Sequence, residues 1–177
     1  MEASNVPALR QQGAVSAKAH GPKSGEYLTF RLGSEEYGID ILKVQEIRSH
    51  EHATHIAGAP PHVVGVLNLR GEIVPVVDLR VQLDSRDVSI GASTVIIVLR
   101  LTGRVVGLVV DSVSEVVDLK RHAVHAAPPI ASAIDSGHIQ GVVDADERMV
   151  ILLDIESMVG DPGMGLAMDP CRDGIAV

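Results

Sequence analysis

Three histidines lie within six residues of one another, and imidazole nitrogens are common zinc ligands. They are His50, His52 and His55. A structural zinc site needs four ligands, and no cysteine or reliably placed carboxylate completes this set. The sequence therefore favours a solvated polar connector between strands. A zinc-stabilised site is the alternative, which metal analysis would test.

Groups for nucleophilic catalysis are present only as isolated residues. Ser112 and Ser114 can be combined on paper with Asp111 and His122 into a Ser–His–Asp triad, but a chain with this many such residues allows that by chance. No Walker loop, GxSxG, HExxH or CxxC motif occurs in the sequence. We therefore predict a protein that is not an enzyme and holds no cofactor or metal.

One hairpin carries a more unusual side chain. In Gly65–Pro75 (GVLNLRGEIVP) apolar residues flank Arg70-Gly71, so a long cation stands at the tip of the turn. Arg70 is either a solvated turn residue or a guanidinium that holds a partner's carboxylate or carbonyl oxygen. Glu46 and Glu115 present a similar choice between the polar face of a strand and a contact with a partner.

The composition indicates that β-strands position these residues. The 177 residues include 26 Val and 14 Ile, against one Phe, two Tyr and no Trp. β-Branched side chains fit a pleated strand better than a helix. The length suits one domain or two very small ones. We therefore predict a mainly β fold.

Charge and cysteine content restrict the partners and the compartment. The formal net charge is −8 and three aromatic residues offer no stacking platform, so nucleic acid is not an expected partner. No apolar run approaches the roughly 20 residues of a spanning helix, and the first residues lack the apolar core of a secretory signal. The single cysteine, Cys171, suits a reducing compartment. We expect a cytoplasmic protein without direct membrane insertion.

Alternating apolar residues and turn signals predict a series of hairpins. The expected strand pairs are Tyr27–Leu32 with Glu36–Ile41, Val66–Leu69 with Ile73–Val77, Val95–Leu101 with Val105–Val110, and Ile139–Val143 with Met149–Leu153. Val44 and Ile47 are expected to continue the second of these strands. Pro75 predicts that its strand lies at an edge or contains a bulge. Short helices are expected at Leu79–Leu83 and after Asp154, the predicted N-cap.

The order of these motifs repeats along the chain. The block Tyr37-Gly38-Ile39 with Val44, Glu46 and Ile47 matches Val106-Gly107-Leu108 with Val113, Glu115 and Val116, every residue being displaced by the same offset. Gly65 and Asp78 are matched in the same way by Gly141 and Asp154, at a slightly larger offset. We infer two copies of one β unit, at about 27–90 and 94–159, each with about five strands that can close a small barrel. Because such a small unit buries only a marginal core, the two should pack together and share one.

Three segments closely resemble the CheW family of bacterial chemotaxis coupling proteins. They are Leu32–Arg48 (LGSEEYGIDILKVQEIR), Gly65–Arg80 (GVLNLRGEIVPVVDLR) and Val105–Val117 (VVGLVVDSVSEVV). The resemblance covers about 26–159 and leaves 1–25 and 160–177 as flexible ends. It implies two five-stranded SH3-like barrels, in agreement with the repeat. It also implies a non-enzymatic adaptor that couples transmembrane chemoreceptors to the histidine kinase CheA and is recruited to membrane-associated signalling arrays.

The resemblance further implies the partners and the residues that contact them. The partners are the regulatory domain of CheA and the cytoplasmic tips of methyl-accepting chemoreceptors. The implied contact residues are Val44, Glu46, Gly65, Asn68, Arg70, Val113 and Val116. We expect the groove between the barrels, with Arg70, Val113 and Val116, to take the receptor. We expect the barrel end around Val44 and Glu46 to take the kinase.

Two further functions compete with this interpretation. A CheW-like module of another receptor–kinase pathway would share the same motifs. A small β-barrel that binds a ligand or zinc is disfavoured, because five-stranded barrels fill their interior with side chains. Screening metabolites by thermal shift would detect such a ligand.

Overall fold

The computed structural model describes residues 21–22, 25–83, 87–128 and 136–166. Within them the strands are β1 (Glu26–Leu32), β2 (Glu35–Asp40), β3 (Val44–Ser49), β4 (Val63–Leu69), β5 (Glu72–Asp78), β6 (Val95–Leu101), β7 (Arg104–Val110), β8 (Ser112–Asp118), β9 (Ala123–His125), β10 (Ile139–Ala145) and β11 (Arg148–Leu153). Short helices connect them: η1 (Ile41–Lys43), α1 (Leu79–Gln82), η2 (Leu119–Arg121), η3 (Ser136–His138), α2 (Ile155–Gly160) and η4 (Pro162–Met164). The predicted mainly β fold is confirmed.

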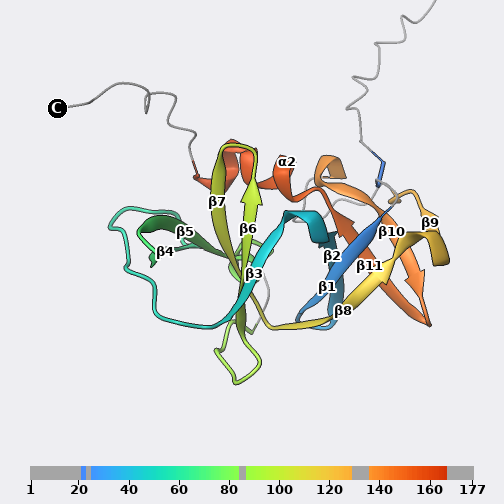
Figure 1. Ribbon diagram of the computed structural model, residues 1–177, viewed down its shortest axis with the longest axis horizontal. Coiled ribbons are helices and arrows are strands. Elements are labelled where there is room, and N and C mark those ends of the chain that lie inside the picture. The colour runs from blue at the N-terminus through green and yellow to red at the C-terminus, as the bar shows by residue number, and fades with distance from the viewer. Residues whose placement is uncertain (1–20, 23–24, 84–86, 129–135, 167–177) are drawn as a thin grey trace, which may run out of the picture.

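The strands form two sheets that lie side by side, one at the left and one at the right of Figure 1. The five-stranded unit has the order β3-β6-β7-β5-β4, and the six-stranded unit has the order β8-β1-β2-β11-β10-β9. The short strand β9 is the addition to the five strands expected for each unit.

The two units do not follow the expected boundaries at 27–90 and 94–159. The five-stranded unit is the contiguous segment from β3 to β7, whereas the six-stranded unit combines β1 and β2 with β8 to β11. The two copies of the repeat therefore exchange strands, so that each sheet inserts the first hairpin of one copy between strands of the other. The repeat could not reveal this, because the order of motifs along the chain is the same with or without exchange.

The exchanged copies keep the same register. Val44 of β3 lies opposite Leu99, and its counterpart Val113 of β8 lies opposite Phe30. In the parallel pairs, Gly107 lies opposite Val76 and Gly38 lies opposite Leu152. A Cβ atom on either glycine would lie 3.0 Å from a side-chain carbon of the packed strands. The glycines at the centre of both repeats thus permit the same close packing.

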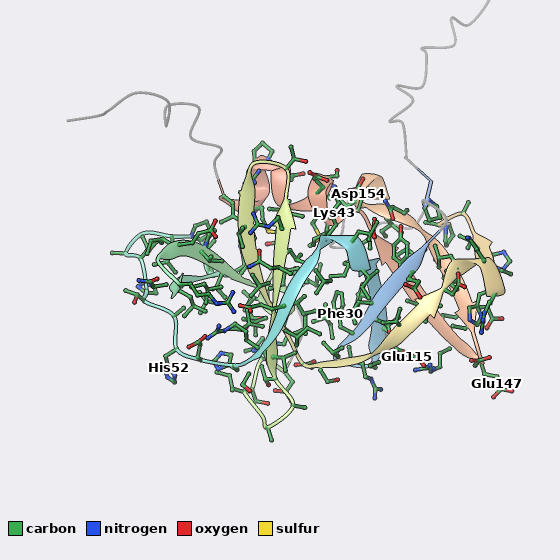
Figure 2. The ribbon with its side chains drawn as sticks, viewed as in Figure 1. Phe30, Lys43, His52, Glu115, Glu147 and Asp154 are labelled. Atoms are coloured by element: carbon green, nitrogen blue, oxygen red, sulfur yellow. The ribbon has the colours of Figure 1, made fainter. Side chains whose placement is uncertain are left out.

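The largest hydrophobic core lies between the two sheets and draws residues from both. On β1, Phe30 faces this shared core and Tyr27 faces a core within the six-stranded unit. On β6, Leu99 faces the shared core and Val98 faces a core within the five-stranded unit. Figure 2 labels Phe30, which is fully buried. The prediction that the units share a core is confirmed, and each strand of the central hairpins is buried on both faces.

The chain beyond α2 is ordered further than the sequence indicates. The sequence predicts a flexible tail from residue 160, but η4 follows directly and Met164 is buried in the shared core. His62 Nε2 forms a 2.7 Å hydrogen bond with the carbonyl oxygen of Met164, and Arg104 donates to that of Leu166 at 2.8 Å. Of the expected flexible ends at 1–25 and 160–177, residues 1–20, 23–24 and 167–177, including Cys171, lie outside the described residues.

Of the two alternatives predicted from Pro75, the edge strand is wrong, because β5 lies between β4 and β7. The β4–β5 pair does contain a register shift, which lies between Val63 and Gly65 of β4. Strand β5 tolerates proline since its pairing with β7 begins only at Val76. Likewise, Val44 and Ile47 do not continue β2. They begin a new strand on the other sheet, after the chain has turned through η1.

Candidate partner-binding surfaces

The tip of the β4–β5 hairpin is a tight turn with two left-handed residues. Arg70 has φ 54° and Gly71 has φ 89°, as a type I′ turn requires. The Asn68 Oδ1 atom accepts a 2.8 Å hydrogen bond from the Gly71 amide and braces the turn. The structure therefore assigns Asn68 a local role, which is to support the turn that displays Arg70.

Arg70 pairs with Glu46, which lies on the opposite edge of the same sheet. The Arg70 Nη2 atom is 2.9 Å from Glu46 Oε2, while the Arg70 side chain remains 73% exposed. The hydrogen bond from Arg70, aided by its charge and by Arg48, lowers the pKa of the Glu46 carboxyl. This ion pair joins β3 to the tip of the β4–β5 hairpin, so the two edges of the five-stranded sheet approach each other.

The six-stranded unit has a matching ion pair. Arg148, at the start of β11, donates to Glu115, the repeat counterpart of Glu46, and lies 3.2 Å from Glu36. The adjoining turn again has two left-handed residues, Asp146 and Glu147. Figure 2 labels both Glu115 and Glu147 on the lower side of this unit, with Glu147 at its outer end. In each unit a Glu–Arg pair thus joins an edge strand, β3 or β8, to the tip of a hairpin.

Exposed apolar side chains stand beside both hairpin tips. Ile73, after the Arg70-Gly71 turn, is 62% exposed, and its counterpart Met149 is 57% exposed. We call Glu46, Arg70 and Ile73 the end surface of the five-stranded unit. Its counterpart, Glu115, Arg148 and Met149, is the end surface of the six-stranded unit. Both combine an ion pair with an apolar side chain, which suits contact with another protein.

A second surface lies along the edge strands β3 and β8, both towards the viewer in Figure 1. Val44 and Val113 are partly buried against the shared core. Three residues beyond each valine lies an exposed aliphatic side chain, 46% exposed for Ile47 and 44% for Val116. We call these four residues the inter-unit surface.

The strand register explains why these four side chains share a side. Ile47 lies opposite Ile97, and Val116 lies opposite Leu28; both partners face the shared core. Residues directly opposite each other on paired strands point to the same face. Glu46 lies opposite Val98 instead, which faces the core of the five-stranded unit. A bulge after Val44 makes this change of face possible.

These positions correct the expected grouping of the contact residues. Arg70 belongs with Glu46 at an end surface, and not with Val113 and Val116. Val44 lies on the side of the shared core with Val113 and Val116, and not with Glu46. The sequence could not separate them, because the bulge that reverses the alternation has no local signal.

Gly65 has a structural task. Its φ is 150°, and a Cβ atom there would overlap the carbonyl oxygen of Thr54. Thr54 and Val66 exchange two backbone hydrogen bonds of 2.9 Å, which hold the connector against β4. Its counterpart Gly141 makes room for His125 of β9 in the same way. Gly65 therefore lets the segment between β3 and β4 pack closely against β4. The motif implied a contact role for Gly65 because it contains both Arg70 and the residues that support the Arg70 hairpin.

Members of the histidine cluster and of the candidate triad have other contacts in the described part of the chain. Within the described part of the chain no group of three or more His, Cys, Asp or Glu side chains is arranged to hold a metal ion. His50 and His52 have a ring contact, and burial lowers the pKa of His50. Asp111 is occupied by Arg80 and by the Gly33 amide. Among the described helices, none has the length and apolarity needed to cross a bilayer.

Residues 26–162 match the family model of the CheW-like domain. The chain belongs to the CheW-like family. It is 47% identical over 154 residues to the chemotaxis protein CheW of Klebsiella aerogenes, covering 86% of this chain and 93% of that one. It is 36% identical over 145 residues to the chemotaxis protein CheW of Rhizobium meliloti, covering 81% and 94%. The fold matches the scaffolding protein TtCheW from Thermoanaerobacter tengcongensis with a TM-score of 0.71 at 30% identity, covering 81% and 93%.

The CheW-like match confirms the resemblance that the three motifs indicate. It extends to residue 162 and therefore includes all of α2. Sequence reasoning missed four members of the surfaces of this CheW-like chain: Ile47, Ile73, Arg148 and Met149. The repeat contains the signal for Ile47, because it is the counterpart of Val116. Ile73 and Met149 are separated by the same offset as Gly65 and Gly141, so the same comparison would have found them together.

Proposed function

We propose that this protein is a non-enzymatic adaptor that couples transmembrane chemoreceptors to the histidine kinase CheA in the cytoplasm. Membership of the CheW-like family supports the proposal, as do relatives that carry the name chemotaxis protein CheW and a structural relative described as a scaffolding protein. The adaptor acts by holding two partners at once, and it is recruited to receptor arrays by its contact with the receptors.

The observation that carries the proposal is the presence of two kinds of exposed surface on one rigid core. The inter-unit surface is aliphatic and lies between the units, whereas the end surfaces combine a Glu–Arg pair with an exposed apolar side chain. Two partners can be held together only if their contact surfaces do not overlap. Simultaneous binding also strengthens an assembly, because each additional contact acts at a high local concentration.

We assign the inter-unit surface to the receptor tip. The tip of a chemoreceptor is helical, and an amphipathic helix lays apolar side chains into a groove between aliphatic side chains. Val44, Ile47, Val113 and Val116 provide such a line of side chains along two strand edges.

We assign the end surface of the five-stranded unit to the regulatory domain of CheA. Arg70 there is largely exposed although it is paired with Glu46, so its remaining N–H groups are available for a carboxylate or carbonyl oxygen of the kinase. Asn68 and Gly65 contribute by supporting the hairpin that carries Arg70.

The decisive test is reconstitution of kinase control. Autophosphorylation of CheA is measured with receptor-containing membranes, with and without this protein. We expect the protein to raise kinase activity in the presence of receptors and to have no phosphotransfer activity of its own. Kinase activity that is independent of the protein would contradict the adaptor function.

Variants matched in exposure test the two assignments. We expect Ile47→Asp to weaken receptor binding about tenfold or more and leave kinase binding intact, and Ile73→Asp to do the reverse. Ile56 (46% exposed, on the connector) and Ile90 (60%, on the loop before β6) are controls of equal exposure. If the Asp variants of the controls lose binding equally, the surfaces are assigned wrongly.

A further inference from the structure

The chain passes between the two sheets twice, and a charged residue stands at each crossover. The first crossover is η1, between β2 and β3, and ends with Lys43. The second is the single residue Asp111, between β7 and β8. Each of these charges is paired with the second residue of a short helix, Glu156 of α2 or Arg80 of α1. Arg80 and Glu156 are separated by the offset that relates Gly65 to Gly141 and are therefore counterparts in the repeat.

We call the ion pair at each crossover, with the hydrogen bonds around it, a crossover clasp. At the second crossover the arginine of the clasp is buried. The Arg80 side chain is 1% exposed and donates two hydrogen bonds to Asp78, from Nε to Oδ1 at 3.0 Å and from Nη2 to Oδ2 at 2.9 Å. Its Nη1 atom donates to Asp111 Oδ1 at 3.2 Å and to the Ser89 carbonyl oxygen at 2.6 Å. Asp111 Oδ2 accepts a 2.7 Å hydrogen bond from the Gly33 amide, in the β1–β2 turn of the other unit. One carboxylate thus joins the two units.

The clasp at the first crossover repeats this arrangement with the charges reversed. The Lys43 Nζ atom is 2.6 Å from Glu156 Oε2, and Glu156 Oε1 accepts a 2.8 Å hydrogen bond from the Thr102 amide. Thr102 lies in the β6–β7 turn and is the repeat counterpart of Gly33. In Figure 2, Lys43 is labelled near Asp154, which caps α2. In both clasps one carboxylate binds a cation and also accepts a hydrogen bond from a turn amide. Glu156, of the six-stranded unit, accepts from Thr102 of the five-stranded unit, just as Asp111 joins Arg80 to the Gly33 amide of the six-stranded unit.

The two clasps stand directly before the strands that form the inter-unit surface. Lys43 precedes Val44 at the start of β3, and Asp111 lies two residues before Val113 on β8. The shared core between the units is apolar, and apolar contact does not by itself fix one orientation. Charge-assisted hydrogen bonds do so, because they require defined directions and distances.

We propose that the two crossover clasps set the relative placement of β3 and β8, and thereby the shape of the surface that receives the receptor tip. Glu156 and Arg80 are positioning residues in this role, since they act through Val44 and Val113 rather than by touching the receptor. The inference rests on the proposed function. It adds to that function a distinction. The clasps set how the two units lie relative to each other and so govern receptor binding, whereas the end surface that carries Arg70 is formed within the five-stranded unit and keeps its geometry.

The test compares Glu156→Gln with the full-length protein in two separate titrations, one with a receptor cytoplasmic fragment and one with the CheA regulatory domain. We expect receptor affinity to fall about fivefold or more, the scale of ordinary coupling between sites, and kinase affinity to change less than twofold. Lys43→Met should give the same split, and the double variant Lys43→Met/Glu156→Gln should be no weaker than either single variant. Lys43→Arg, which keeps the charge, should retain most of the affinity.

Two further variants complete the design. Asp111→Asn tests the buried clasp, and if it fails to fold, the partly exposed Lys43–Glu156 clasp still decides the question. Arg121→Met is the matched control, because its ion pair with Asp118 lies within one unit. Unchanged receptor affinity in Glu156→Gln, or equal losses for both partners in step with a lower melting temperature, would overturn the inference.

A measurement without partners separates this inference from the proposed function. Amide hydrogen exchange should become faster at Thr102 and at the start of β3 in Glu156→Gln, while the β4–β5 hairpin is unaffected. If exchange at β3 does not change, the proposed positioning role of the clasp is wrong even when the adaptor function holds. If the unmodified protein binds neither partner while exchange changes as expected, the proposed function is wrong but the positioning role of the clasp is supported.

Discussion

Arg70 combines an unfavourable backbone with a largely exposed side chain. A non-glycine residue in the left-handed region costs about 1 kcal/mol or more, and an exposed ion pair returns little of that. Neither the turn nor the ion pair therefore explains why an arginine occupies this position. The proposed role in binding would explain it, since a guanidinium offers two directed hydrogen bonds to a partner's oxygen atoms.

Arg70→Asn separates the two roles of this residue. Asn-Gly is the favoured sequence for a type I′ turn, so the variant should melt at the same temperature as the original protein or slightly above it. The guanidinium is lost, so affinity for the CheA regulatory domain should fall about tenfold. Melting curves and a kinase titration measure both effects. A lower melting temperature together with weaker binding would mean that Arg70 braces the fold.

Glu156 predicts how the protein responds to acid. Hydrogen bonds from Lys43 and Thr102 lower the pKa of its carboxyl from 4.5 to about 2. Because the folded protein favours the ionised form, the stabilisation is complete above about pH 4.5 and is lost as the pH falls towards 2. The group is partly exposed, so the effect is modest. We expect Glu156→Gln to be less stable at neutral pH and the difference to vanish towards pH 2. Denaturant unfolding from pH 7 to 2 measures this, and a constant difference would contradict it.

At the scale of elements, the hairpins could be predicted because their signals are local. Alternation, turn residues and the Asp154 cap lie within a few residues of what they determine. The strands β3 and β9 could not be predicted in this way. Val44 and Ile47 continue the apolar pattern of β2, and only the distant pairing with β6 assigns them to another sheet. The extension to Met164 likewise depends on His62 and Arg104, far away in the sequence.

The same limit applies to the candidate surfaces. The seven predicted contact residues came from motifs, and the motifs locate both exposed side chains and their supports. Gly65 and Asn68 support the hairpin, whereas Arg70 is displayed by it. Only the hydrogen-bond partners distinguish these tasks, and the sequence does not contain them.

The glycines that admit neighbouring backbone should rank in their cost when replaced by alanine. Gly65→Ala combines a left-handed φ with overlap of the Thr54 carbonyl oxygen, so it should cost about 2–4 kcal/mol. Gly141→Ala should cost less, because its Cβ atom would lie 2.8 Å from the His125 oxygen without a positive φ. Gly91→Ala, with open space around it, is the control. Urea unfolding gives the free energies, and equal values for Gly65→Ala and Gly91→Ala would refute the role of Gly65.

For the whole molecule, the exchange of strands changes what a half of the chain can do. A fragment ending near residue 90 contains β1 to β5, which are two strands of one sheet and three of the other. The pairs β1–β2 and β4–β5 are native neighbours, but β3 has no native neighbour in this fragment, because the β6–β7 hairpin separates it from β5. Small size alone would make such a half marginal, and the missing partners make it unable to form either sheet.

The exchange predicts instead that the two halves fold together. Fragments 1–90 and 91–177 should each be unfolded alone, and on mixing they should form a complex with the circular dichroism spectrum and cooperative melting of the intact protein. The association is expected because each sheet and the shared core need strands from both fragments, so folding and binding occur together.

A fragment of residues 41–110 is the control, since it holds all five strands of one sheet. It should not complement fragment 91–177, which would still lack β1 and β2. Size-exclusion chromatography of the mixtures detects the complexes. A stable, monomeric fragment 1–90 would show that the strands can pair within one copy of the repeat and that the exchange is not required for folding.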